Sequence, residues 1–280
     1  MKRLGLLVLA LAAMLGARAA DLEPVKNAGP YVPSPEAAVA AMLRYAQVGA
    51  NDFLIDLGSG DGRIVRTAAK LFGARGFGVE IKEDLVKLAN EEAKKEGIAD
   101  KVKFVKQDLF KTDVSQATVL TMYLLPDTVN LLKDKLLSEL KPGTRIVSHD
   151  YPLTGWLPED SKQFDLPEKV SISGVTTTII WLYIVPAKVA GRWTAQLPPA
   201  LSRQPATLHL TQQMITRVSG SARLDGKEVL LEEVRLRGDQ ISFRLAGRKG
   251  EFSGQVKQRR IEGTVDTGGA KLPWSAALAG

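Results

Sequence analysis

The sequence contains no cysteine and only two histidines. Without thiols the chain has no disulfide scaffold and no thiolate metal site, and two histidines are few for a transition-metal site. We therefore expect no bound metal. Glycine and proline are also too sparse, at 25 and 14 of 280 residues, for a collagen-like or low-complexity chain. A folded globular protein of one large or two ordinary domains remains.

The excess of positive charge is small once its location is considered. The chain carries 38 Lys and Arg against 31 Asp and Glu, a formal charge of +7, but Lys2, Arg3 and Arg18 lie at the extreme N-terminus. Without them the net charge is +4, which is too little to argue for a polyanionic partner, and no basic stripe alternates with aromatic residues. The sequence therefore predicts no nucleic-acid partner.

The N-terminus has the three parts of a secretory signal peptide. Lys2 and Arg3 precede the apolar run Leu4–Leu15, and Ala17-Arg18-Ala19 follows as a small-residue cleavage site. The run is shorter than the roughly 20 residues that span a bilayer, so we expect a signal peptide over residues 1–19 and no stable membrane span in the mature chain. The protein would then be periplasmic or extracellular. The alternative is an uncleaved or non-functional segment, which would leave the protein in the cytoplasm.

We expect one domain over residues 20–185. Helical and strand patterns alternate from Pro35 to about Lys141, which indicates an α/β domain with a parallel sheet. We expect strands at 53–57, 76–81, 102–105, 117–124 and 144–148, with helices at 34–45, 63–72, 82–96 and 128–140. Ser34 is expected to cap the first helix. The runs 164–173 and 176–185 show no helix between them, and we expect them to form an antiparallel hairpin at the sheet edge. The predicted fold is a Rossmann-like doubly wound sheet.

Residues 186–280 have the sequence pattern of an all-β domain. Short alternating runs follow one another at 207–212, 215–224, 228–236, 240–245, 251–256 and 260–265, separated by turn residues. This pattern predicts an antiparallel meander or a small closed barrel. A glycine follows an apolar position by two in several runs, at Gly220, Gly254 and Gly263, and we interpret these glycines as relief of crowding in tightly curved strands.

A glycine-rich turn follows the first predicted strand. Asp56-Leu-Gly58-Ser59-Gly60-Asp-Gly62 lies at the switch point of a doubly wound sheet, where ligands bind and a helix begins. The turn reads G-x-G-x-G behind a leading acid, whereas a pyrophosphate site reads G-x-G-x-x-G. A carboxylate facing the ligand repels pyrophosphate but suits the ammonium group of S-adenosylmethionine.

Two further acidic residues lie at the ends of the next two predicted strands, in positions equivalent to that of Asp56. Glu80 closes the second strand, about 20 residues beyond the glycines, where a carboxylate meets a ribose diol. Asp108 follows the third strand and can meet an adenine amino group. We therefore predict that S-adenosylmethionine is bound by the set Asp56, Gly58, Ser59, Gly60, Gly62, Glu80 and Asp108.

The sequence resembles class I S-adenosylmethionine-dependent methyltransferases. More narrowly, it is similar to the archaeal broad-specificity protein lysine methyltransferases and to the mitochondrial family that methylates a lysine of the ATP synthase c-subunit. The segments that carry this resemblance are Pro30–Pro35, Asp56–Ile64, Gly78–Ile81, Ala117–Leu125 and Leu140–His149 with Gly155-Trp156. The resemblance runs from about Pro30 to Val185 and does not include the β-rich half.

The resemblance implies methyl transfer to the ε-amino groups of protein lysines, so the expected partner is a protein with an accessible lysine. A lysine amine has a reference pKa of about 10.4 and must be neutral to react. An apolar, aromatic-walled channel favours that neutral form and also holds a sulfonium. Tyr31, Tyr123 and Trp156 are the candidates for this channel, and Tyr31, between two prolines, is also a candidate lid over the cofactor. His149 is expected to hydrogen-bond to a neighbouring loop rather than to act as a base.

Two other functions stay open on the sequence alone. One is a methyltransferase that acts on a small molecule or an envelope lipid. The other is an exported, non-catalytic binding protein, in which the β-rich half performs the recognition. A Ser-His-Asp hydrolase is poorly supported, since no G-x-S-x-G turn is present.

Overall fold

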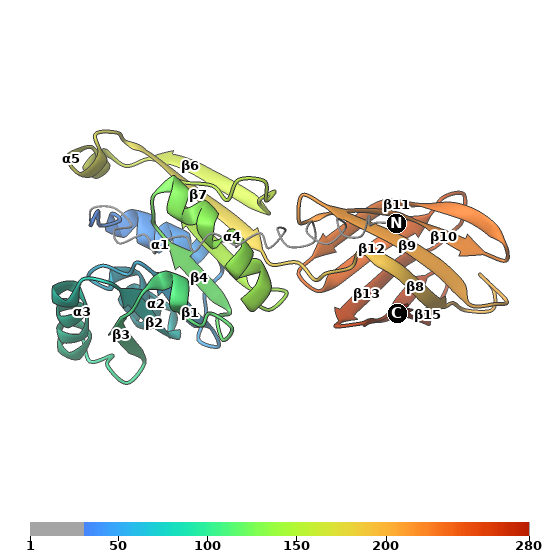
Figure 1. The fold of residues 1–280 in the computed structure, drawn as a ribbon, viewed down its shortest axis with the longest axis horizontal. Coiled ribbons are helices and arrows are strands. Elements are labelled where there is room, and N and C mark those ends of the chain that lie inside the picture. The colour runs from blue at the N-terminus through green and yellow to red at the C-terminus, as the bar shows by residue number, and fades with distance from the viewer. Residues whose placement is uncertain (1–30, 280) are drawn as a thin grey trace, which may run out of the picture.

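The computed structural model describes residues 31–279, so the predicted signal peptide at residues 1–19 lies outside the described residues. Figure 1 shows an α/β body and a β-barrel along the long axis of the molecule. Among residues 31–279, no helix has the length and apolar character needed to cross a bilayer.

The α/β body is built on a seven-stranded sheet with the order β3-β2-β1-β4-β5-β7-β6. The strands are β1 (Phe53–Leu57), β2 (Arg75–Glu80), β3 (Val102–Lys106), β4 (Val119–Met122), β5 (Arg145–His149), β6 (Asp160–Asp165) and β7 (Thr177–Ile184). The first five strands are parallel, and β7 is antiparallel to both of its neighbours. The predicted doubly wound sheet with an antiparallel edge is thus confirmed.

Helices cover both faces of this sheet. They are α1 (Glu36–Tyr45), α2 (Arg63–Phe72), α3 (Glu83–Lys95), α4 (Pro126–Glu139) and the short α5 (Val170–Ser173). Apolar residues of α1, α2 and α3 pack into one core cluster with the sheet, whereas α4 packs into a second cluster on the other face. Loops that join the carboxyl ends of the strands to these helices therefore meet at one edge, which we call the carboxyl edge.

The strongest local signals in the sequence produce the elements at this edge. Phe53–Leu57 is short and apolar, and four of its five residues are buried as β1. Gly62 and Gly73 flank α2, each with a positive φ that a side chain would disfavour. As a result, both β1 and α2 have the predicted bounds.

Two predictions for this domain are wrong. The first strand of the edge hairpin is Asp160–Asp165, and the segment predicted to be extended instead holds α5, which ends at Gly174. Ser34 also does not cap α1, since its hydroxyl hydrogen-bonds His149 and the helix begins after Pro35. In each case a tertiary contact overrides the local pattern.

Residues 191–278 form a closed eight-stranded antiparallel barrel. Its strands are β8 (Gly191–Gln196), β9 (Ala206–Gln213), β10 (Arg217–Leu224), β11 (Lys227–Arg237), β12 (Gln240–Leu245), β13 (Glu251–Lys257), β14 (Arg260–Asp266) and β15 (Lys271–Leu278). Strand β15, which the sequence pattern does not predict, closes the barrel against β8. Of the two predicted alternatives, a meander or a barrel, the structure has the barrel.

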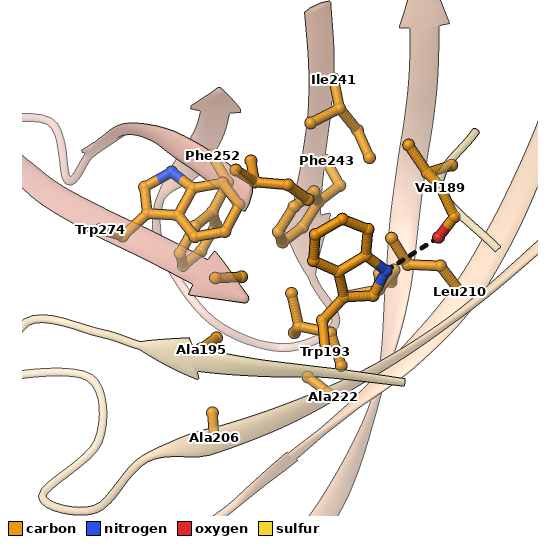
Figure 2. Packing of buried hydrophobic residues seen from close by; sticks show 14 of the residues in the cluster. Val189, Trp193, Ala195, Ala206, Leu210, Ala222, Ile241, Phe243, Phe252 and Trp274 are labelled. Atoms are coloured by element: carbon orange, nitrogen blue, oxygen red, sulfur yellow. Dashed lines mark hydrogen bonds between the residues drawn. The ribbon is translucent and has the colours of Figure 1, made fainter. Parts of the chain in front are cut away.

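Side chains fill the interior of the barrel. Phe243 and Phe252 stack with ring centroids 4.8 Å apart, and Trp274 packs edge-on against both (Figure 2). Trp193 is fully buried and donates from its indole nitrogen to the carbonyl of Val189, 2.8 Å away. Since this interior is a packed core, any recognition by the barrel takes place on its outer surface or rims.

The recurrent barrel glycines lie where strands approach too closely for a side chain. A Cβ on Gly220 would lie 2.1 Å from the carbonyl oxygen of His209, and one on Gly263 would lie 1.9 Å from that of Ser253. At Gly254 a Cβ would meet Ile261 at 2.8 Å. The prediction that these glycines relieve crowding is confirmed.

The barrel joins the sheet at the end opposite the carboxyl edge. The residue pair Arg145 and Ile184 lies at the amino end of β5, and the chain leaves β7 there to enter β8. The amide of Ala187 donates to the carbonyl of Gly238, and a Cβ on Gly238 would lie 3.0 Å from Gly143 of the sheet. The barrel therefore does not cover the carboxyl edge.

Candidate functional site

The glycine-rich turn after β1 is held by backbone hydrogen bonds to the neighbouring strand. The amides of Gly58 and Ser59 both donate to the carbonyl of Val79, each over 2.9 Å. The carboxylate of Glu80 accepts from the amide of Gly60 at 3.1 Å, and its other oxygen accepts from the amide of Lys82 at 2.9 Å. Glu80 thus fixes the turn and places its carboxylate at the carboxyl edge.

Asp56 lies at the end of β1, buried directly beneath this turn. Its side chain is 1% exposed and accepts a hydrogen bond of 2.7 Å from the hydroxyl of Thr121 on the adjacent strand β4. Burial raises the pKa of Asp56 to about 7, against the lowering effect of the Thr121 hydrogen bond. A buried carboxylate without a cation is costly, so this position favours a ligand that brings a positive charge.

Tyr31 lies over the same turn. Gly60 has a φ of +53°, and a Cβ built on it would lie 2.4 Å from the Tyr31 ring, so the ring rests on the bare glycine backbone. Burial, followed by the nearby carboxylate of Asp61, raises the pKa of Tyr31. The phenol therefore remains neutral at physiological pH.

The segment from Tyr31 to Pro35 is tied to the turn by Arg63. The Arg63 guanidinium pairs with Asp61 over 2.7 Å and donates to the carbonyl of Ser34 over 2.9 Å. With Tyr31 on Gly60, this gives the segment two attachments to the turn, which is the arrangement expected of a lid over a bound cofactor.

A second group of polar side chains lies beside the turn, at the ends of β4 and β5. Nδ1 of His149 lies 2.9 Å from the hydroxyl oxygen of Ser34, which confirms the prediction that His149 hydrogen-bonds to a loop. The rings of His149 and Tyr123 are 4.0 Å apart between centroids. One hydrogen bond thus joins the segment from Tyr31 to Pro35 to the end of β5.

These side chains are electrically neutral at physiological pH. Burial lowers the pKa of His149 to about 4. Burial, followed by the charge of Asp150, raises the pKa of Tyr123 well above its usual value. The carboxylate of Asp150 is in turn neutralised by Lys169, whose Nζ lies 2.6 Å from it. A neutral wall of this kind favours an uncharged amine over an ammonium ion.

Sequence reasoning did not identify Lys169 or Thr121. Lys169 is 1% exposed, in a turn between β6 and α5, and it holds Asp150 in a backbone conformation with a φ of +63°. Neither residue belongs to a local sequence motif, because each acts through a contact with a residue on another strand or loop. Lys169 lies within the run 164–173 that was predicted to be extended, and nothing in that run indicates that its lysine is buried.

The remaining predicted residues lie in different places. Asp108 follows β3 at the carboxyl edge, and one of its carboxylate oxygens accepts from the amide of Phe110. The Ser59 side chain is buried against Gly78. Trp156 is 3% exposed and packs on Tyr183 within the core cluster beneath α4. Tyr31 and Tyr123 are therefore brought to the same edge, whereas Trp156 lies in the core on the α4 face of the sheet and does not join them.

The edge as a whole fits S-adenosylmethionine. Side chains pack on the glycine backbone of the turn, with Leu124 at Gly58 and Tyr31 at Gly60. Asp56 offers a buried carboxylate to an ammonium group, and the Glu80 carboxylate can accept from ribose hydroxyls. Among residues 31–279 no group of three or more acids or histidines could hold a metal ion. The arrangement provides polar groups that can align a cofactor and complement its charge, and alignment is the main requirement of a displacement at a methyl carbon.

Comparison with known proteins gives consistent matches to the α/β body. A family model described as the ANTKMT methyltransferase domain matches residues 56–160. A protein-lysine N-methyltransferase from Saccharolobus islandicus is 46% identical over 132 residues, which cover 47% of this chain and 82% of the archaeal protein. The adenine nucleotide translocase lysine N-methyltransferase of mouse is 33% identical over 162 residues, which cover 58% of this chain and 66% of the mouse protein.

A solved structure shares both fold and sequence. The chain is 44% identical to a structure described as an RNA methyltransferase from Salinibacter ruber in complex with S-adenosyl-L-homocysteine, with a TM-score of 0.51. The match covers 56% of this chain and 96% of the other. The family-model match lies within the α/β body, and the three other matches each cover between 47% and 58% of this chain.

Proposed function

The chain belongs to the protein-lysine N-methyltransferase family, and from this membership we propose that it methylates the ε-amino groups of lysines in a protein substrate. The observation that supports this most is the 46% identity to the archaeal enzyme across 82% of that enzyme's length. The match to the family model, over residues 56–160, includes the glycine turn and the strand ends that form the candidate site.

The cofactor of this family is S-adenosylmethionine, which supplies a methyl group on a sulfonium and leaves as S-adenosylhomocysteine. Asp56 would pair with its ammonium group, Glu80 and the backbone of Gly58–Gly62 would hold its ribose and amino-acid portions, and Asp108 would face its adenine. Tyr31 would close over the cofactor from the lid segment. The positions of these residues at the carboxyl edge and their hydrogen bonds support these proposed roles.

The acceptor lysine would enter beside Tyr123 and His149. Each of these rings is neutral at physiological pH, and Lys169 cancels the charge of Asp150 behind them. This environment stabilises a neutral lysine amine, so that the chain needs no strong base and water can accept the proton.

RNA is a second candidate substrate, since the Salinibacter ruber structure is described as an RNA methyltransferase. The charge of the α/β body favours the protein substrate. Residues 31–185 carry 19 Lys and Arg against 21 Asp and Glu, a net charge of −2. A surface that binds an RNA backbone is expected to carry an excess of positive charge.

We also propose that the first 19 residues direct export, on the basis of the basic start, the apolar run and the Ala-Arg-Ala end. Mass measurement of the N-terminus of protein purified from the native cell tests this. A chain that begins near Ala20 supports export, and an intact N-terminus in a cytoplasmic fraction contradicts it.

The methylation test uses purified protein, radiolabelled S-adenosylmethionine and a panel of lysine-bearing proteins. Each is offered untreated and with its amines capped, beside a pool of cellular RNA. Label in untreated proteins that is lost on capping supports lysine transfer. Label in RNA, or label that survives capping, contradicts it. Asp56→Asn serves as the control that shows label depends on the cofactor site.

A further inference from the structure

The charge of the molecule is concentrated in the barrel. Residues 186–280 carry 15 Lys and Arg against eight Asp and Glu, a net charge of +7, whereas the α/β body is slightly negative. All fifteen of these cations are exposed. The net charge of the whole chain is therefore located mainly in one strongly basic domain, the barrel.

The acids of the barrel are confined to one side. Strands β15, β8, β9 and β10 are neighbours in the barrel and contain no Asp or Glu. The other four strands carry six acids, namely Glu228, Glu232, Glu233, Glu251, Glu262 and Asp266. We call the outer surface of β15, β8, β9 and β10 the acid-free face.

Arginines and small polar residues make up this face. Arg192 is opposite His209, Arg223 is opposite Thr207, and Arg217 is opposite Gln213 in the strand register. Serine, threonine and glutamine occupy most of the other outward positions, and Glu228 borders the face by accepting from Ser221 over 2.7 Å. The ion pairs within the described barrel use other cations, at Arg244 and Lys257. Arg223 is also opposite Glu228 of β11 in the register, and none of the three arginines forms an ion pair with another described residue.

We propose that the acid-free face docks an acidic segment of the protein substrate. Guanidinium groups bind carboxylates through paired, charge-assisted hydrogen bonds, and the surrounding hydroxyls and amides add neutral donors. The barrel is closed, so an added strand has no free edge to pair with, and recognition must use the outward side chains. This inference rests on the proposed function for the identity of the partner.

Two other anionic partners fit less well. The aromatic residues of the four strands, Trp193 and Trp274, are buried, so the face offers no platform on which bases could stack. Its outward apolar residues are limited to Pro273 and Ala277, which are poor anchors for a bilayer. A flexible acidic peptide needs neither feature.

Docking on the barrel would act as a tether. The barrel is attached at the amino end of the parallel strands, so the docking face belongs to a domain at the opposite end of the sheet from the carboxyl edge. A tethered substrate presents its lysine at a raised local concentration without changing the site itself. The expected effect is on KM, with kcat unchanged.

The first test measures binding of a lysine-free polyglutamate peptide of about 20 residues to the full chain by fluorescence anisotropy. The triple variant Arg192→Gln, Arg217→Gln, Arg223→Gln is compared with the matched control Arg235→Gln, Arg244→Gln, Lys249→Gln, which removes equal charge elsewhere on the barrel. If each surface charge contributes about 0.5 kcal/mol, the triple variant should bind about tenfold more weakly. The control variant should change binding less than twofold, and added salt should weaken the wild type.

The outcomes separate this inference from the proposed function, because the peptide has no lysine and the assay needs no methyl transfer. Absence of polyglutamate binding, or equal loss in both variants, overturns the docking proposal. Tighter binding of a single-stranded oligonucleotide or of anionic phospholipid vesicles, lost only in the triple variant, also overturns it in favour of that partner. With an active enzyme, an acidic tail on a lysine peptide should lower KM at constant kcat for the wild type alone.

Discussion

At the scale of single residues, the site depends on groups that are buried and therefore unusually sensitive to charge. Asp56 has no counter-ion beneath the glycine turn, and Thr121 provides its one side-chain hydrogen bond among the described residues. Its carboxyl is consequently half-protonated near neutral pH. A cationic ligand would bind its ionised form, which couples ligand affinity to pH.

This coupling gives a first prediction. The affinity for S-adenosylmethionine should rise with pH up to about 7, by roughly tenfold per unit, since Asp56 must lose its proton to pair with the ammonium group. Asp56→Asn should bind weakly and lose this pH dependence. Calorimetric titrations between pH 5.5 and 7.5 measure both. The exposed-acid variant Asp84→Asn is the control, and parallel pH profiles for wild type and Asp56→Asn would contradict the assignment.

His149 gives a second prediction, on stability. Its pKa is lowered to about 4 by burial, against an ordinary value near 6.5 in the unfolded chain. The unfolded state therefore binds the proton first, and the stability contributed by neutral His149 is present above pH 6.5 and lost as the pH falls towards 4. Asp56 has a raised pKa, so its contribution to stability changes in the opposite direction over this pH range. The contribution of His149 must therefore be measured as the difference in unfolding free energy between the wild type and a His149 variant.

The comparison uses His149→Asn, which keeps a hydrogen-bonding group near Ser34 but does not titrate. Between pH 6.5 and 4 the free energy of unfolding of the wild type should fall by about 3 kcal/mol more than that of the variant. Chemical denaturation at several pH values measures this difference. The exposed His209→Asn should follow the wild type, and a His149→Asn curve that also follows it would refute the buried, neutral state of His149.

At the scale of elements, the segment from Tyr31 to Pro35 connects the two halves of the site. It rests on Gly60, accepts from Arg63 and hydrogen-bonds His149 through Ser34. The hydroxyl of Ser34 is thus the one direct hydrogen bond, among the described side chains, between the lid segment and β5. Loss of this bond should loosen the lid without altering the groups that bind the cofactor directly.

Ser34→Ala should therefore raise the Kd for S-adenosylmethionine several-fold. A buried group that loses its hydrogen-bond partner costs about 1–3 kcal/mol. Part of this cost lowers the stability of the fold, and the rest lowers the affinity for the cofactor. Calorimetry gives the Kd, and denaturation gives the loss of stability. Ser138→Ala, on the exposed side of α4, should change neither quantity. If Ser34→Ala destabilises the fold but binds the cofactor like the wild type, the segment is not a lid.

The helices and strands also show how much of the fold could be predicted from the sequence. Strand β1, the glycine turn and α2 were predictable because apolar runs, positive-φ glycines and the helix start all agree locally. Strand β6 reads Asp-Ser-Lys-Gln-Phe-Asp and is nearly all exposed, so it is a strand only because it pairs with β7. The run 164–173 was predicted to be extended, whereas Gly174 ends a short helix there. Edge elements depend on their partners, which local patterns do not contain.

The same limit applies to the site. The acids and glycines of the carboxyl edge were predictable because strand ends in a parallel sheet must meet at one edge. The contacts that set their chemistry join residues far apart in sequence, as Ser34 to His149 and Asp56 to Thr121. Lys169 was not predictable, since a buried lysine follows from its ion pair with Asp150 and from no pattern of its own.

At the scale of the whole molecule, the two bodies have separate cores. The barrel interior forms one apolar cluster, and the α/β body has one cluster on each face of its sheet. The described hydrogen bonds between them are few, such as that from Arg237 to Glu159 on the surface and that from Ala187, in the connecting segment, to Gly238. Ile215, between β9 and β10, also packs against the α4-side cluster of the α/β body. A small set of contacts of this kind couples domains weakly. Because the barrel is attached far from the carboxyl edge, ligand at that edge has no direct contact through which to stabilise the barrel.

Differential scanning calorimetry should therefore show two unfolding transitions. S-adenosylhomocysteine, the product of the cofactor, should raise the Tm of only one of them. At S-adenosylhomocysteine concentrations of about 100 times Kd, binding stabilises the liganded unit by about 2.7 kcal/mol. For a unit of this size that corresponds to a rise in Tm of roughly 5–10 °C, while the barrel transition should stay within about 1 °C. Asp56→Asn, which should lose the shift but keep both transitions, identifies the α/β transition. A common shift of both would mean that the barrel and the sheet unfold as one unit, and that events at the acid-free face and at the carboxyl edge are coupled through the junction at Gly143 and Gly238.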